Sequence, residues 1–211
     1  MSTIDSSRIF PEFFDQAPVL QVRDPLAEFL GAAQGGLLTY RYEDAVKLAG
    51  HSCPTVASAY LMVIRGLKAL YGSEIPERGG IEVLVKKGRE EGTTGVVASM
   101  ATLLTGAATE TGFGGMGPAG RFARRNLLSF DNPIDCTLLL RRRDTGRAVE
   151  VTAHEEAVPW PEEMKALLPL AVSGKANEEE LNRFRELWQG RVRKMLVEFA
   201  EDDRLVEVRL V

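Results

Sequence analysis

The sequence predicts an α+β fold. Its helix–strand–helix–three-strand core would form a mixed or antiparallel sheet, with helices added at the C-terminal end. Three observations indicate this class: an apolar pattern of helical period follows Pro54, short alternating runs lie at 81–85 and 136–153, and a second long helical pattern starts near Asn177. A sheet with both core helices on one face buries this pattern most economically.

We expect three parts: an N-terminal arm with a short helix (1–40), the α+β core (41–158), and a C-terminal helical extension with a closing strand (159–211). In the arm, Asp24-Pro25 reads as an N-cap followed by proline at the first helical position. The arm also carries apolar residues that should pack on the main body, namely Phe10, Phe13, Phe14, Val19 and Leu20.

The core begins with an amphipathic helix over 42–48 that stops at Gly50, followed by a mostly buried helix from Pro54 to about Tyr71. A strand over 81–85 follows, then a helix from 93 or 94 to a stop at Gly106. A glycine-rich stretch covers 107–120, and a strand is expected over 126–130. A hairpin over 136–153 comes next, followed by a helix that starts at Trp160 and that we expect Pro169 to interrupt. The last expected elements are a long helix over 177–200 and a strand over 205–211.

Residues 136–153 predict a β-hairpin. Matching apolar side chains sets a register that pairs Leu140 with Val149, Leu138 with Val151 and Cys136 with Ala153, around a four-residue loop. In this register Cys136 points into the core, and His154 lies on the opposite, polar face. We therefore do not expect these two side chains to join the same metal site.

The composition and charge of the chain exclude several classes of function. The 211 residues carry a formal charge of −4, so nothing draws the chain to nucleic acid or to an anionic membrane. The first eight residues do not resemble a secretory signal, and no apolar segment is long enough to span a bilayer. With 2 cysteines and no signal, we expect reduced thiols and a cytoplasmic location.

The candidate site is the stretch Gly50-His51-Ser52-Cys53-Pro54. Cys53 would lie at a helix N-terminus, where unpaired N–H groups favour thiolate, the form that binds metals or attacks. His51 and Cys53 are both ligand types that zinc accepts. Two alternatives stay open: a catalytic thiol with His51 as its base, and a buried cysteine that starts a helix beside a surface histidine.

The glycine-rich stretch does not match a P-loop or a dinucleotide-binding fingerprint. Either it is a surface loop, or it is a lid over the Cys53 pocket. In the second case Arg121, Arg124 and Arg125 would bind an anionic ligand.

The motif around Cys53 resembles the Gly-His-x-Cys-Pro-Gly opening of the FmdE family, which takes its name from the FmdE subunit of formylmethanofuran dehydrogenase. Three further segments look like that family's motifs: 104–107 (Leu-Thr-Gly-Ala), 125–127 (Arg-Asn-Leu) and 143–149 (Arg-Asp-Thr-Gly-Arg-Ala-Val). The resemblance covers about 42–152. It implies a small α+β domain that binds a divalent metal, usually zinc, through His51 and Cys53, in a family that tends to form dimers.

The chain departs from the family pattern at three positions. Ala107 stands where the family has cysteine, Thr55 stands where it has glycine, and residues 92–94 lack the cysteine expected there. Glu90, Glu91, water or a bound ligand would have to complete a metal site, or the metal has been lost.

Three functions follow from these observations. The first is an FmdE-like protein with a metal or small-molecule pocket at His51 and Cys53. The second is a metal-independent enzyme with Cys53 as an activated thiol on an anionic substrate. The third is a homodimeric binding or scaffold module that assembles through the arm and the long C-terminal helix.

Overall fold

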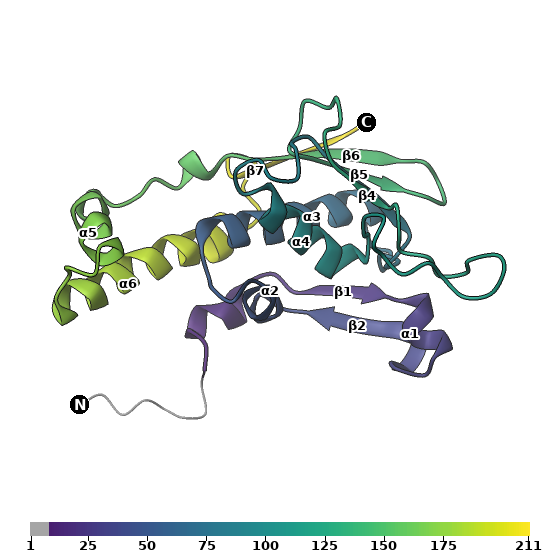
Figure 1. Cartoon of the computed structure of the whole chain (residues 1–211), viewed down its shortest axis with the longest axis horizontal. Coiled ribbons are helices and arrows are strands. Elements are labelled where there is room, and N and C mark those ends of the chain that lie inside the picture. The colour runs from purple at the N-terminus through teal and green to yellow at the C-terminus, as the bar shows by residue number, and fades with distance from the viewer. Residues whose placement is uncertain (1–8) are drawn as a thin grey trace.

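A mixed sheet of five strands, in the order β4-β3-β5-β6-β7, forms the centre of the molecule (Figure 1). The structure is a computed structural model that describes residues 9–211; the first eight residues of the predicted arm lie outside the described part. The strands are β3 (Ile81–Val85), β4 (Leu128–Ser129), β5 (Leu138–Arg142), β6 (Ala148–Ala153) and β7 (Val206–Leu210). Only the β3–β4 pair is parallel, so the predicted α+β class with a mixed sheet is confirmed.

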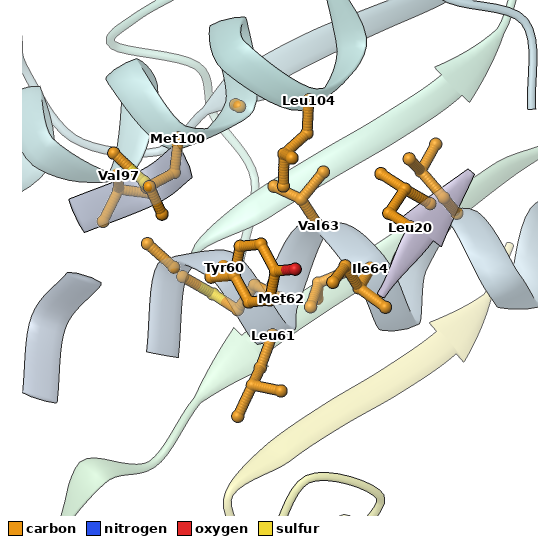
Figure 2. Packing of buried hydrophobic residues seen from close by; sticks show 14 of the residues in the cluster. Leu20, Tyr60, Leu61, Met62, Val63, Ile64, Val97, Met100 and Leu104 are labelled. Carbon is orange, nitrogen blue, oxygen red and sulfur yellow. The ribbon is translucent and has the colours of Figure 1, made fainter. Parts of the chain in front are cut away.

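Two helices, α3 (Pro54–Tyr71) and α4 (Thr94–Thr105), lie side by side against one face of this sheet. Both have the predicted positions, and α3 is buried along most of its length. Figure 2 shows Met100 and Leu104 of α4 directed at α3, whereas Leu61 of α3 points to the other side. Because α3 has apolar neighbours on both sides, its apolar residues extend around most of the helix rather than forming one stripe.

At Gly66, α3 packs closely against the sheet. A Cβ atom at this position would lie 2.6 Å from Cδ1 of Leu140 and 3.1 Å from Cγ2 of Val151. Both of these neighbours are fully buried and have little room to move. Gly66 therefore sets the distance between the helix and strands β5 and β6.

The N-terminal part packs as predicted but contains a small sheet that the sequence did not reveal. Its elements are η1 (Glu12–Gln16), β1 (Leu20–Arg23), α1 (Pro25–Phe29), η2 (Gln34–Gly36), β2 (Leu37–Tyr40) and α2 (Tyr42–Ala49). Strands β1 and β2 pair antiparallel. Phe13, Phe14 and Leu20 join the core, whereas Val19, which directly precedes strand β1, is exposed.

The C-terminal part consists of η3 (Glu155–Ala157), α5 (Glu162–Val172), α6 (Glu178–Arg193), the π-helical turn η4 (Lys194–Glu198) and strand β7. The capping box of Asn177 and Glu180 is present. Pro169 lies inside α5 without interrupting it, since the helix runs on to Val172. Strand β7 pairs with β6, so the chain ends in the core sheet. No helix among the described residues is long and apolar enough to cross a membrane.

The hairpin has the predicted register, with Leu138 opposite Val151 and Leu140 opposite Val149. The prediction for Cys136 is wrong. Its side chain is buried, but it packs with Leu139 and Ala148 on the other face of the sheet, outside the main core. The alternation fails because β5 begins only at Leu138, and the bend before it turns Cys136 to the other side.

Gly66→Val should destabilise the protein by about 2 kcal/mol or more, since the added carbons must displace fully buried side chains. The matched control is Gly190→Val, because a Cβ at this α6 position meets no atom within 4 Å. That variant should change the free energy of unfolding by no more than about 0.5 kcal/mol. Urea denaturation of both variants measures the difference; equal effects would show that α3 does not approach the sheet this closely.

Candidate functional site

The turn between α2 and α3 has the predicted helix stop at Gly50 and the predicted helix start at Cys53 and Pro54. Gly50 ends α2 in the left-handed conformation, with a φ of 75°. Cys53 is the N-cap of α3, and its Sγ accepts a hydrogen bond of 3.4 Å from the backbone N–H of Val56. Pro54 occupies the first turn, where no N–H is required. The thiol of Cys53 is therefore held at the helix N-terminus.

Ser52, which the sequence did not single out, connects this turn to α6. Its hydroxyl donates to Oε1 of Gln189 (3.0 Å), and the Tyr42 hydroxyl lies 3.1 Å away. Its carbonyl accepts from Nε1 of Trp188 (2.9 Å) and Nε2 of Gln189 (3.2 Å). The single hydrogen of the Ser52 hydroxyl is donated to Gln189, so the Tyr42 hydroxyl, whose pKa is raised by burial, donates to Ser52. No sequence pattern could reveal these bonds, because Gln189 is 137 residues from Ser52.

His51 is exposed, and its Nδ1 lies 2.9 Å from the carbonyl oxygen of Ala49. A carbonyl only accepts, so Nδ1 carries the hydrogen in this contact and Nε2 of a neutral ring has a free lone pair. The ring lies at the edge of two cavities. Cys53 lines neither of them.

The larger of these cavities, about 490 Å³, is an open groove between η1, the α2–α3 turn and α6; we call it the Trp188 groove. Its walls are mainly aromatic and aliphatic, and no Asp or Glu contributes to them. It is lined by Phe10, Pro11, Phe14, Val46, His51, Ser52, Phe184, Arg185, Trp188 and Gln189. Arg185 is exposed and donates to Asn182 at 2.9 Å, but it has no carboxylate partner among the described residues.

The other cavity, about 400 Å³, lies between the end of α2 and the start of α4. Its lining includes His51, Glu90 and Arg89, and the Arg89 side chain is directed at Glu110 with a closest N–O distance of 3.4 Å. Glu90 thus shares a cavity with His51, as a supplementary ligand would require. Glu91 pairs instead with Lys87 at 3.4 Å.

The donor set at this turn does not fit a resident zinc ion. Structural zinc takes four protein ligands and catalytic zinc takes three, usually tetrahedrally. Among residues 9–211, no group of three or more His, Cys, Asp or Glu side chains is placed to hold a metal. Cys53 and His51 supply two donors, and Ala107, at the expected third position, is a fully buried apolar residue.

The structure does not bring Arg121, Arg124 and Arg125 to the Cys53 turn. Arg124 donates to the carbonyl of Arg78, whose side chain donates to the Leu103 carbonyl near the C-terminal end of α4. The segment between α4 and β4 that carries all three arginines lies on the right of Figure 1, whereas α6 lies on the left. The 18 residues of α3 separate the two ends by about 27 Å. The alternative that the loop is a lid over Cys53 is therefore not supported.

The side chain of Arg124 has a structural role in the fold. It is buried, donates to the carbonyl of Arg78, and pairs with the buried carboxylate of Asp24 at 2.6 Å. Arg78 pairs with the same carboxylate at 3.0 Å. The guanidinium of Arg121 lies over the rings of Phe29 and Phe122, and exposed Arg125 contacts the backbone at Gly112. Of the three, only Arg121 and Arg125 have exposed side chains.

The remaining cysteine and histidine lie away from this turn. Cys136 lines a cavity of about 280 Å³ at the start of α4, with Lys86, Thr94 and Thr152 in the same wall. His154 lies 3.4 Å from Glu156 and 3.6 Å from Glu207. The predicted reason for separating them is wrong, because Cys136 does not point into the main core. They nevertheless form no group of three metal ligands with any described residue.

Comparisons with known proteins bear on the family that the sequence motifs resemble. No family model matches the chain, and no curated protein matches it. A solved structure of a tungsten formylmethanofuran dehydrogenase FmdE-like protein from Syntrophus aciditrophicus is similar, with 18% identity and a TM-score of 0.42. The match covers 82% of this chain and 72% of that one. That protein is described with the same family name as the motifs, but at this similarity neither family membership nor activity follows for this chain.

Asp24→Asn should destabilise the protein by about 3–5 kcal/mol, because two arginines then lose their buried counter-charge. Burial raises the pKa of Asp24. The hydrogen bond from Arg78, the charge of Arg124 and two backbone N–H groups together outweigh this effect, so the net pKa lies below the ordinary value of 3.8. A depressed carboxyl pKa contributes stability above the unfolded value, and that stability is lost as pH falls below about 4. Urea unfolding of the variant should therefore lack this part of the acid dependence.

The control is Asp203→Asn, which removes an exposed partner of Arg65. Its cost should stay below about 1 kcal/mol. If Asp24→Asn costs no more than this control, the Asp24–Arg124 network does not stabilise the fold as described.

Proposed function

We propose that this protein binds a small aromatic or aliphatic ligand with a negatively charged group in the Trp188 groove. The observation that supports this best is the composition of the groove: a volume of about 490 Å³, aromatic walls, and no acidic lining residue. Small-molecule sites typically have this size and combine apolar walls with a few polar groups. His51 and Arg185 supply those groups at the edge of the groove.

The walls of the groove are held in place before any ligand arrives. The Trp188 indole is oriented by its bond to the Ser52 carbonyl and lies against Phe184 and Trp160, with ring centroids 5.5 and 5.0 Å apart. On the opposite wall, Phe14 packs edge-on against Tyr42 at 4.9 Å. A preorganised wall lowers the entropic cost of ordering side chains on binding. This supports a binding role rather than a surface depression without function.

Charge complementarity supports an anionic ligand. Arg185 lines the groove and makes no ion pair with any described residue. If Arg185 binds the carboxylate or sulfonate of a ligand, the apolar part of that ligand would lie against Trp188 and Phe184. A metal at His51 and Cys53 remains an alternative ligand that the donor set supports poorly.

Isothermal titration with 2-naphthoate tests the proposal. We expect saturable binding at one site, weaker by about tenfold in Arg185→Gln, since a hydrogen bond to a charged group contributes about 1.5 kcal/mol or more. Phe184→Ala should also weaken binding. The neutral isostere 2-naphthamide should bind to the native protein less tightly than 2-naphthoate does. Its affinity should be the same for the native protein and for Arg185→Gln.

The matched control is Arg147→Gln, which removes an exposed arginine from the hairpin. It should bind 2-naphthoate as the native protein does. Absence of saturation, or equal losses in Arg147→Gln and Arg185→Gln, would contradict the proposal. A second copy seated in the groove would instead weaken binding as protein concentration rises, with a matching increase in mass by light scattering, and would favour the homodimer.

The competing role of Cys53 as an activated thiol can be separated by alkylation. Cys136 is buried, and burial raises the pKa of its thiol, so it should react with iodoacetamide at least about tenfold more slowly than Cys53 at pH 8. Peptide mass spectrometry measures both rates. A Cys53 rate that persists well below pH 7 would favour thiol chemistry over simple capping, and protection of Cys53 by added zinc would favour the metal.

A further inference from the structure

The other side of α6 carries a second, smaller cavity of about 260 Å³ between this helix and residues 159–161. We call it the Arg191 cavity. None of its lining residues belongs to the Trp188 groove, so the two lie on different faces of α6. Its walls include Pro159, Pro161, Leu187, Gly190, Arg191 and Lys194.

Arg191 is 6% exposed, yet it has no carboxylate partner within ion-pair distance among the described residues. Its Nε donates to the carbonyl of Val158 at 2.6 Å and its Nη2 to the carbonyl of Glu155 at 2.7 Å. The guanidinium lies 4.2 Å from the ring centroid of Trp160. Burial lowers the pKa of Arg191, while the charge of Glu155 opposes this effect only in part. A buried cation held by neutral groups is short of compensating negative charge.

The third nitrogen of this guanidinium is available to a ligand. Nη1 of Arg191 has no hydrogen-bond partner among the described residues. Every buried side-chain nitrogen or oxygen in the same part of the chain does have a partner. Nη1 is therefore not among the buried atoms. Arg191 lines the cavity, and Nη1 keeps both of its N–H groups for a ligand there.

Two further features of α6 suit a small anion. Gly190 stands inside the helix, where glycine costs about 1 kcal/mol relative to alanine, and a Cβ there would meet no atom within 4 Å. The missing side chain keeps the cavity open. Lys194 is exposed in the same wall without an ion pair among the described residues, whereas Glu186, the acidic group of this wall, pairs with Arg183 at 3.2 Å.

We infer that the Arg191 cavity binds a small oxyanion, a phosphate or a compact carboxylate, through Nη1 of Arg191 and the ammonium of Lys194. The planar guanidinium suits oxyanion geometry, and the lysine adds a point charge. The volume of the cavity restricts the ligand to a compact molecule. This site is independent of the Trp188 groove and of the ligand proposed there.

Calorimetric titration of the full chain with inorganic phosphate at low ionic strength tests the inference. We expect one saturable site in the native protein. Lys194→Gln should weaken binding about five- to tenfold, and Gly190→Leu should abolish it by filling the cavity. Because leucine is a better helix former than glycine, Gly190→Leu should unfold at no lower a urea concentration than the native protein, which separates blocked binding from misfolding.

Two controls make the outcome specific. Lys175→Gln removes a lysine near the opposite end of α6 and should leave phosphate affinity unchanged. Phe184→Ala, a variant of the Trp188 groove, should also leave it unchanged, so failure of one site does not imply failure of the other. Absence of saturation in the native protein, unchanged binding in Gly190→Leu, or equal losses in Lys175→Gln and Lys194→Gln would overturn the inference.

Discussion

The burial of α3 is the constraint on which the rest of the structure depends. This helix packs on β5, β6 and β7, on α4, and at Tyr60 against Tyr42 of α2. Gly66 allows it to approach the sheet closely, so its axis cannot shift outward without opening the core. Its two ends are therefore placed firmly: the Cys53 turn at one end, and the Asp24–Arg78–Arg124 network at the other.

The packing at the Cys53 end depends more on Ser52 than on His51 or Cys53. Ser52 makes its bonds with both its hydroxyl and its carbonyl, and these bonds hold α6 against the turn. As a result α6 contributes to two cavities of different character. One face supplies aromatic walls to the Trp188 groove, and another places a buried arginine, without an ion-pair partner among the described residues, beside the Arg191 cavity.

The other end of α3 shows why a motif containing arginines is not by itself a ligand site. Asp24 caps α1 through the N–H groups of Leu26 and Ala27, and it also accepts from two arginines. Arg124 thereby connects the glycine-rich loop to the N-terminal part. A buried carboxylate with such partners is stabilising only while every member is present, so this network anchors the loop rather than leaving Arg124 free for a substrate.

The sequence by itself determined the element order of the core, the boundaries of α2, α3 and α4, the hairpin register and the capping of α3 by Cys53. These features depend on apolar periodicity and on local residues such as Gly50, Pro54 and Asn177, whose conformational preferences act within a few positions. Only the tertiary structure decided the β1–β2 pair, the side of the sheet on which Cys136 lies, and which residues surround His51. Those outcomes depend on contacts between segments far apart in the chain, such as Ser52 with Gln189 and Asp24 with Arg124, which no local pattern encodes.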